Sequence, residues 1–87
     1  MKMSVRKPTD AEITQTQNWG DWGRVPCTFT WFYDSKETCL ILAGKATVTS
    51  TDGSQITFKA GDWVEFDEGL ECTWTITETI QKKYQFD

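Results

Sequence analysis

Polar and apolar residues alternate along most of the chain, which is the pattern of half-buried β-strands. Residues 71–79 alternate most clearly, with Cys72, Trp74 and Ile76 on one face and threonines on the other. Residues 45–49 alternate in the same way. Because successive side chains of a strand point to opposite faces of a sheet, each run predicts a strand with one face toward a core.

Turn residues divide the remainder into further short strands. Residues 51–54, 60–62 and 67–69 each contain a glycine beside polar residues and predict turns. The expected strands are 37–43, 45–49, 55–59, 63–66, 71–79 and 80–86, after an aromatic run at 29–33, and Gly44 is expected to end the first of them. About seven or eight short strands indicate an all-β sandwich or barrel.

One segment near the start predicts a helix. Thr9 precedes Glu12 by three residues, the spacing of a capping box, and the helix has room for about two turns before Asn18. We therefore expect a single domain of 87 residues, in which 1–26 form an N-terminal arm with a short helix and 27–87 form the barrel.

The composition excludes several classes of function. The chain has no histidine, which excludes Ser-His-Asp catalysis, Cys-His catalysis and imidazole-based zinc sites. Its net charge of −4 predicts no nucleic-acid partner and no anionic-membrane partner. Three cysteines without CxxC spacing, no signal-peptide pattern and no bilayer-length apolar run indicate a reduced, cytoplasmic protein.

Two spaced motifs carry a resemblance to a known family. Six residues separate Glu37 from Gly44, and Gly61, Gly69 and Cys72 form a second motif. These spacings resemble the cupin motifs, of which the first runs Gly, five residues, His-any-His, three or four residues, Glu, six residues, Gly. The second runs Gly, five residues, Pro-any-Gly, two residues, His, and Cys72 stands at that histidine position.

The histidine positions of the first motif also hold other residues. A three-residue gap before Glu37 places them at Trp31 and Tyr33, and a four-residue gap places them at Thr30 and Phe32. Every position at which a cupin supplies imidazole is therefore occupied here by a different side chain.

A finer resemblance is to small single-domain cupins related to the ethanolamine-utilisation cupin and to ureidoglycine aminohydrolase. It rests on residues 7–9, 37–39, 44–48, 58–62, 69–74 and 83–86, and so covers nearly the whole chain. It implies a small cupin (RmlC-like) jelly-roll barrel with the motif residues facing its mouth. Members of this branch often have a histidine where Lys83 stands.

The resemblance and the alternation together place a candidate site in the barrel mouth. The expected ligand-binding residues are Trp31, Tyr33, Glu37, Cys72 and Trp74. Glu37 is interpreted either as a buried carboxylate that binds a ligand or moves a proton, or as a strand-end residue that is solvated or paired with Lys36 or Lys45. Cys72 is interpreted either as a thiolate ligand or nucleophile, or, preferably, as an inert buried thiol.

A metal would have to be held by Glu37, Cys72 and Tyr33, a set without imidazole, so we expect no metal and no cofactor. Leu40 and Leu42 lie on the opposite face from Glu37, which indicates that this outer face is also covered. The expected cover is the N-terminal segment or a second subunit, which predicts a homodimer. The tryptophans expected to seal the barrel or a subunit contact are Trp19, Trp22 and Trp63.

Three functions fit these observations. The favoured one is a metal-free cupin barrel that binds an unidentified small molecule. The second is an enzyme similar to ureidoglycine aminohydrolase, acting on a ureido or amino-acid-like substrate with Glu37 as general base and Cys72 or Lys83 assisting. That activity is associated with a manganese site, whose ligands this sequence does not supply. The third is a structural or interaction subunit whose barrel is filled by its own side chains.

Overall fold

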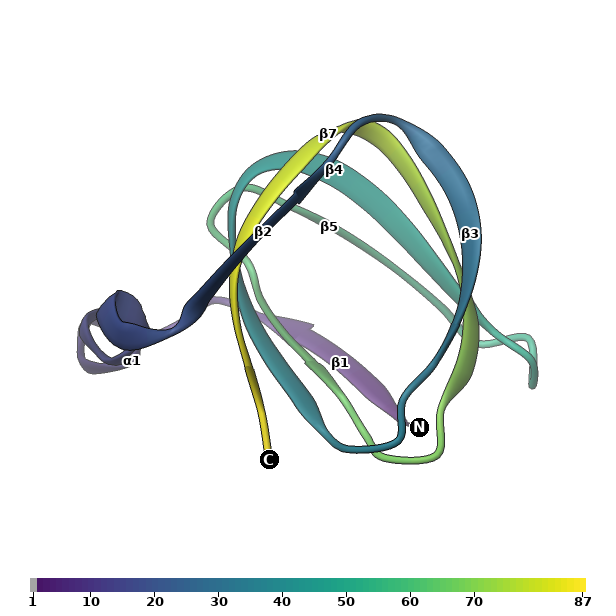
Figure 1. The fold of residues 1–87 in the computed structure, drawn as a ribbon, viewed down its shortest axis with the longest axis horizontal. Coiled ribbons are helices and arrows are strands. Elements are labelled where there is room, and N and C mark those ends of the chain that lie inside the picture. Colours follow the sequence, from purple (N-terminus) through teal and green to yellow (C-terminus); the bar gives the residue numbers. More distant parts are fainter. Residues whose placement is uncertain (1) are drawn as a thin grey trace.

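Two long strands form the centre of the fold. In the computed structural model, which describes residues 2–87, β4 (Glu37–Ser50) and β7 (Glu71–Phe86) pair antiparallel along their lengths. Both strands bend, and each has two shorter neighbours on its other edge (Figure 1). The neighbours of β4 are β6 (Trp63–Phe66) and β5 (Gln55–Lys59), and those of β7 are β3 (Cys27–Phe32) and β2 (Gly20–Arg24).

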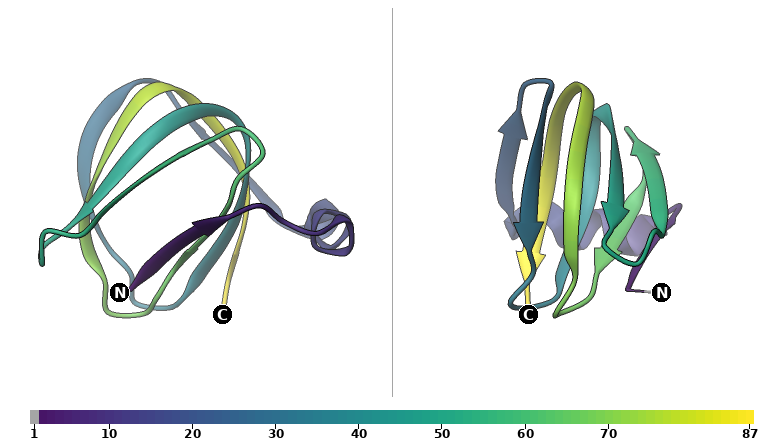
Figure 2. Two further views of the ribbon diagram at one scale, coloured as in Figure 1. Left: turned by 180° about the vertical axis from the view of Figure 1, so that it is seen from behind. Right: turned by 90° about the vertical axis from the view of Figure 1, so that its right-hand side faces the viewer.

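One more strand completes the sheet. β1 (Met3–Arg6) pairs with β6, which gives the order β1-β6-β4-β7-β2, with β5 on β4 and β3 on β7. The sheet curls around a common interior, as the two views of Figure 2 show. The predicted all-β cupin-like roll is confirmed.

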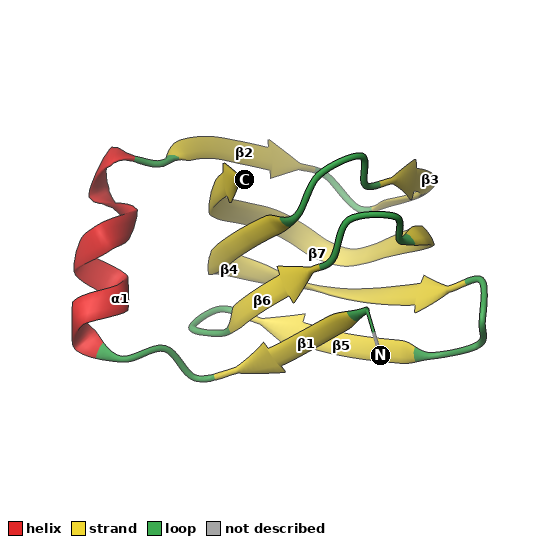
Figure 3. Cartoon of the chain, turned by 90° about the horizontal axis from the view of Figure 1, so that it is seen from below, coloured by secondary structure: helices red, strands yellow, loops and turns green. Residues whose placement is uncertain are grey.

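The short predicted helix is also present. α1 (Asp10–Gln15), continued by the 3-10 turn Thr16–Asn18, lies outside the barrel and connects β1 to β2 (Figure 3). The capping box has formed, because Thr9 Oγ1 accepts from Glu12 N at 3.2 Å and Thr9 N donates to Glu12 Oε1 at 2.9 Å. Within residues 2–87, no helix has the length and apolar character needed to cross a membrane.

The residues assigned to an N-terminal arm contribute two strands of the sheet. β2 pairs with β7 from Gly20 opposite Tyr84 to Arg24 opposite Ile80. β1 pairs with β6 over its whole length. The glycines and the aspartate of 20–24 carry no strand pattern of their own, and pairing with β7 is what makes this segment extended. The expected boundary after residue 26 therefore does not separate the arm from the barrel.

Gly44 does not end a strand, contrary to the prediction. The register of β4 against β7 shifts on both sides of it, and β4 continues to Ser50. Gly44 has φ +90°, and a Cβ there would lie 2.1 Å from the carbonyl oxygen of Thr79. The residue therefore forms a bulge that only glycine can occupy, and the bulge bends the strand. β7 is likewise continuous where two strands were expected.

Apolar side chains form the core of the barrel. The most deeply buried of them are Tyr33, Cys39, Ile41, Val48, Phe58, Val64, Phe66, Leu70, Trp74 and Ile80. On the outer face, Leu40 is buried and lies opposite Trp63 in the register, and the Trp63 ring is 5.5 Å from that of Trp19. Leu42 is 48% exposed. The first of the two outward leucines is thus buried on the face that carries Trp63, and the second is open.

Candidate functional site

A pocket of ≈ 180 Å³ lies between β2, β3 and β7 and the start of β4. Its aromatic lining residues are Trp22, Phe29, Trp31, Tyr33, Trp74, Tyr84 and Phe86, and its charged ones are Arg24, Glu37 and Lys82. Four of the five residues expected in the site, Trp31, Tyr33, Glu37 and Trp74, line this one pocket. An apolar lining with a few convergent polar groups is typical of small-molecule sites.

Trp74 forms the deep wall of the pocket. Its ring stacks on Phe29 at 5.9 Å between centroids and meets Trp22 edge-on at 6.0 Å. Trp31 lies at the opening, since half of its surface is exposed, and meets Tyr33 edge-on at 6.4 Å. These offset and edge-to-face arrangements are the ones that aromatic rings prefer, so the rings of the wall support one another.

Tyr33 combines a buried ring with a polar end. The ring stacks on Phe66 with centroids 4.9 Å apart. Burial, together with the negative charge of Glu37, raises the pKa of Tyr33 well above its ordinary value. Its hydroxyl therefore stays protonated at physiological pH and is a neutral hydrogen-bond donor.

Glu37 and Lys82 form a buried ion pair in the pocket. Lys82 Nζ donates to Glu37 Oε2 at 2.8 Å, and the two side chains are 6% and 4% exposed. The same ammonium lies 4.8 Å from the ring centroids of both Trp22 and Trp74. The two charges thus compensate each other in an apolar setting, and the tryptophan faces add cation–π attraction.

Lys82 and Arg24 are charged pocket residues that sequence reasoning missed, and neither of the lysines considered as partners of Glu37 pairs with it. Lys36 pairs instead with Glu65 at 3.2 Å, and Lys45 is exposed. The alternation that placed Trp74 inward continues along β7 to Lys82, so the signal was present. It was outweighed by the usual rule that lysine faces solvent.

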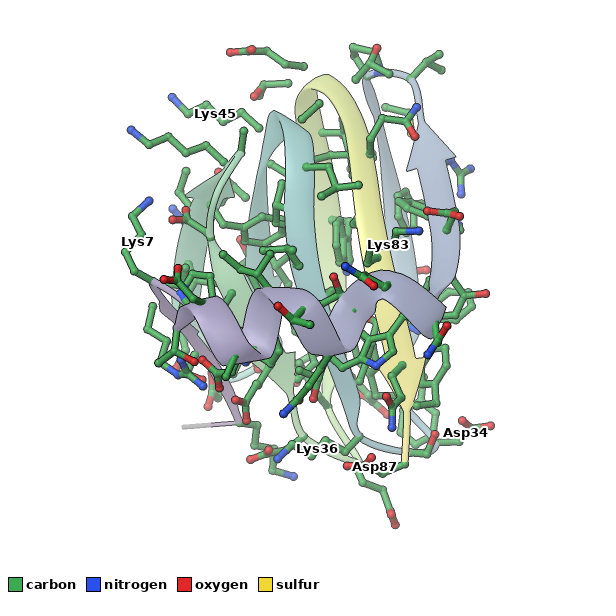
Figure 4. All side chains as sticks on the ribbon, turned by 90° about the vertical axis from the view of Figure 1, so that its left-hand side faces the viewer. Lys7, Asp34, Lys36, Lys45, Lys83 and Asp87 are labelled. Atoms are coloured by element: carbon green, nitrogen blue, oxygen red, sulfur yellow. The ribbon has the colours of Figure 1, made fainter. Side chains whose placement is uncertain are left out.

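Lys83, the position at which the resemblance expects a histidine, faces away from the pocket. Its Nζ lies 2.8 Å from Asp21 Oδ1, and Asp21 is largely exposed. Figure 4 shows Lys83 on β7 behind the helix. The structure therefore gives Lys83 no contact with Glu37 or with Cys72 that would support the assisting role considered for it.

Cys72 lies beside the pocket and does not line it. It is 3% exposed, its Sγ donates to Trp31 O at 3.6 Å, and it borders a neighbouring depression between β3 and β7. Burial and the negative charge of Glu37 raise the pKa of Cys72 to about 11. A thiol that remains protonated at neutral pH is a poor nucleophile and a poor metal ligand, which supports the inert interpretation.

Trp22 lines the pocket, whereas we expected it to seal the barrel or a subunit contact. It stands opposite Lys82 in the register of β2 with β7, so both side chains point to the same face of the sheet. The two other sealing candidates, Trp19 and Trp63, contact each other and are absent from the pocket lining. The error followed from treating 20–24 as an arm.

One lining residue of the pocket, Tyr84, packs over a glycine of β2. A Cβ at Gly20 would lie 2.8 Å from Cζ of Tyr84, so the ring of Tyr84 occupies the space that a side chain would need. Tyr84 also meets Phe86 edge-on at 5.6 Å. The absence of a side chain at Gly20 thus leaves room for the Tyr84 ring, which lines the pocket.

The described residues do not gather the side chains of a metal centre. Over residues 2–87, no three or more histidine, cysteine, aspartate or glutamate side chains come close enough together to hold an ion. The pocket supplies one carboxylate, and that carboxylate is bound by an ammonium. Metal sites with catalytic roles usually have at least three protein ligands.

A small antiparallel roll with the motif glutamate at the start of a central strand and an aromatic interior pocket defines a cupin barrel. Residues 11–84 match the family model described as the EutQ-like cupin domain, and the chain belongs to this family. No curated protein matches the chain.

Several solved structures are similar to this chain. A DUF861 family protein from Thermotoga maritima is 36% identical with a TM-score of 0.94, and the match covers 98% of this chain and 99% of that one. A DUF861 family protein of unknown function from Pseudomonas syringae is 26% identical with a TM-score of 0.70, over 78% of this chain and 29% of that one. A putative ethanolamine utilization protein Q from Salmonella typhimurium is 17% identical with a TM-score of 0.71, and the match covers 97% of this chain and 68% of that one. At that identity, the last likeness shows the fold alone.

Proposed function

We propose that this protein binds a small organic molecule in the aromatic pocket of its barrel, and that it does so without a metal ion. The pocket has an ordered aromatic wall, a neutral phenol and one buried ion pair. Its volume of ≈ 180 Å³ favours a binding role over a barrel filled by its own side chains.

The proposal depends on one observation: the ammonium of Lys82 already binds the carboxylate of Glu37. A metal ion at Glu37 would have to approach an ammonium that lies 2.8 Å from the carboxylate. Like charges at such a distance repel strongly in a poorly hydrated site. With no histidine in the chain, nothing compensates for this repulsion.

The indole N–H signals of the five tryptophans provide a direct test of binding. In a two-dimensional ¹H–¹⁵N spectrum, a fragment that occupies the pocket should shift the signals of Trp22, Trp31 and Trp74 and leave those of Trp19 and Trp63 in place. The variant Trp74→Leu should lose the response, and the matched variant Trp19→Phe should keep it. A library of single-ring fragments that shifts only Trp19 and Trp63, or none of the five, would contradict the proposal.

The metal-free part of the proposal is tested separately. Protein purified without chelators should contain no stoichiometric transition metal by elemental mass spectrometry. Added Mn²⁺, which is paramagnetic, should not broaden the signals of Trp22 and Trp74. Stoichiometric metal, or selective broadening of these two signals that is lost in Glu37→Gln, would overturn the absence of a metal and would revive the enzyme alternative.

We further propose that the protein is a cytoplasmic homodimer. Leu42 remains exposed on the outer face of β4, and a second copy would cover it. The three cysteines are unpaired, which suits a reducing compartment. Light scattering at micromolar concentration should give twice the mass of the chain, and Leu42→Lys should give the mass of one chain. A monomeric mass for the unaltered protein would contradict the dimer.

A further inference from the structure

The pocket carries a net positive charge although the chain is acidic. Arg24 and Lys82 contribute two positive charges and Glu37 one negative charge, which leaves +1 in a protein whose formal charge is −4. Over residues 2–87, no carboxylate lies within 4.0 Å of the Arg24 guanidinium. A locally positive, apolar cavity attracts an anion and raises its local concentration.

Lys82 also has unused capacity to donate hydrogen bonds. An ammonium carries three N–H donors, and in the described part of the chain Glu37 Oε2 is the one acceptor that Lys82 reaches. The residue is only 5% exposed, so bulk water does not readily supply the others. An anionic oxygen in the pocket would form a charge-assisted hydrogen bond with this ammonium.

The same cations exclude a positively charged ligand. Aromatic cages bind cations over their ring faces, but here the faces of Trp22 and Trp74 already hold Lys82 at 4.8 Å. The ring of Phe29 holds the guanidinium carbon of Arg24 at 4.3 Å. The protein's own charges therefore fill the positions that an amine or a quaternary ammonium would need.

The volume and the lining limit the rest of the ligand. A cavity of ≈ 180 Å³ is smaller than the roughly 300 to 1,000 Å³ of sites for drug-sized molecules. Its walls are the flat rings of Trp22, Trp31 and Trp74, which suit a flat apolar body. A single ring that bears one anionic group meets both requirements.

We infer that the ligand class of this pocket is the small aromatic carboxylate, with its carboxylate held by Lys82 and Arg24 and its ring against Trp22 and Trp74. This inference rests on the proposed function, since it names the chemistry of the molecule that the pocket binds. Glu37 has a definite role in this inference, because its carboxylate competes with the ligand for Lys82 and holds the ammonium in position through the 2.8 Å contact.

Three probes of nearly equal shape test the inference: benzoate, benzamide and benzylamine, which carry a negative, a neutral and a positive group. Their affinities are measured from the indole N–H shifts of Trp22, Trp31 and Trp74 at fixed pH and ionic strength. Benzoate should bind at least about tenfold more tightly than benzamide, which corresponds to about 1.4 kcal/mol. Benzylamine should bind more weakly than benzamide.

Variants of the three charged residues sharpen the test. Lys82→Met and Arg24→Gln should each weaken benzoate binding by about tenfold or more, because each removes a charged donor. Glu37→Gln should strengthen it, since the substitution removes the competitor for Lys82 and raises the pocket charge to +2. The matched control is Lys83→Gln, a neighbouring lysine that faces outward, and it should leave the affinity unchanged. The circular dichroism of each variant reports whether it has folded.

Two results would overturn the ligand class while leaving small-molecule binding intact: tighter binding of benzamide or benzylamine than of benzoate, or weaker benzoate binding in Glu37→Gln. A third result, no pocket response to any of the three probes, also overturns the inference. The fragment screen described for the proposed function then tests small-molecule binding independently of the ligand class.

Discussion

Glu37 and Lys82 meet although their backbones are four residues out of register. In the ladder between β4 and β7, Glu37 stands opposite Phe86 and Lys82 stands opposite Ile41. Their side chains nevertheless approach to 2.8 Å inside the barrel. The ion pair therefore runs diagonally across the two central strands, which joins the beginning of β4 to the last third of β7.

Removing one partner of this pair should be far more damaging than removing both. Lys82→Met leaves a buried carboxylate uncompensated and should lower the free energy of unfolding by about 3 kcal/mol. The double variant Glu37→Gln/Lys82→Met leaves no buried charge and should recover most of that loss. Urea unfolding followed by tryptophan fluorescence measures both, and Lys83→Met, which breaks an exposed pair, should cost less than about 1 kcal/mol. Equal losses for the single and double variants would contradict this account.

Gly44 and Gly53 offer a matched test of the bulge in β4. Both have positive φ, but a Cβ at Gly44 would meet the Thr79 carbonyl oxygen at 2.1 Å, whereas a Cβ at Gly53 would meet nothing within 4 Å. Gly53→Ala should cost about 1 kcal/mol for its strained backbone alone. Gly44→Ala should cost clearly more, because the strand must also move. If the urea midpoints rank the two variants in the opposite order, β4 tolerates a residue with a side chain at position 44.

The Cys72 thiol should resist alkylation at neutral pH. Its pKa of about 11 leaves roughly one thiolate in a thousand at pH 8, and burial slows access further. In a Cys27→Ser variant, labelling by a disulfide reagent should be slow at pH 8 and should accelerate steeply as the pH approaches 11. Rapid labelling of Cys72 at pH 7 would restore the nucleophile interpretation. Cys39, whose pKa is raised by burial to about 12, should label last.

The Arg6–Glu12 pair should make stability depend on pH in the acid range. Arg6 donates to both oxygens of Glu12 at 2.8 and 2.6 Å, and these bonds, with the one from Thr9 N, lower the pKa of Glu12 to about 2 from its ordinary 4.5. Because the folded-state pKa is lowered, the contribution is present above pH 4.5 and is lost as the pH falls toward 2.

Carboxyl chemical shifts of Glu12 measure this pKa directly. Arg6→Gln should bring the pKa of Glu12 closer to its ordinary value and should flatten the fall of the urea midpoint below pH 4.5. The control Lys2→Gln, elsewhere near the N-terminus, should leave both unchanged. An unaltered Glu12 titration in Arg6→Gln would show that the capping box alone, through Thr9, holds this carboxylate.

Local patterns in the sequence were sufficient for most of the elements. The expected strands 55–59 and 63–66 agree with β5 and β6, because turn residues flank both and each carries its own apolar face. The capping box predicted α1 because its two hydrogen bonds involve only Thr9 and Glu12, three residues apart. Elements that depend on such short-range interactions can be predicted from the sequence.

The errors concern positions that distant parts of the chain determine. Gly44 has the same sequence signal whether it ends a strand or forms a bulge, and the closeness of Thr79 decides between them. Trp22 faces the pocket because β2 pairs with β7, and residues 20–24 carry no local pattern that predicts this pairing. Lys82 is tolerated inside only because Glu37 reaches it from another strand. Each of these positions depends on a residue far away in the chain, and the sequence alone does not show that the two residues lie close together.

The close approach of Tyr84 to Gly20 makes the position of a lining residue depend on a residue that does not line the pocket itself. A methyl group at position 20 would overlap the phenol ring, so the ring would have to move, and its edge-on contact with Phe86 would change. A bulkier residue at position 20 would accordingly alter the shape of the pocket even with every lining residue unchanged.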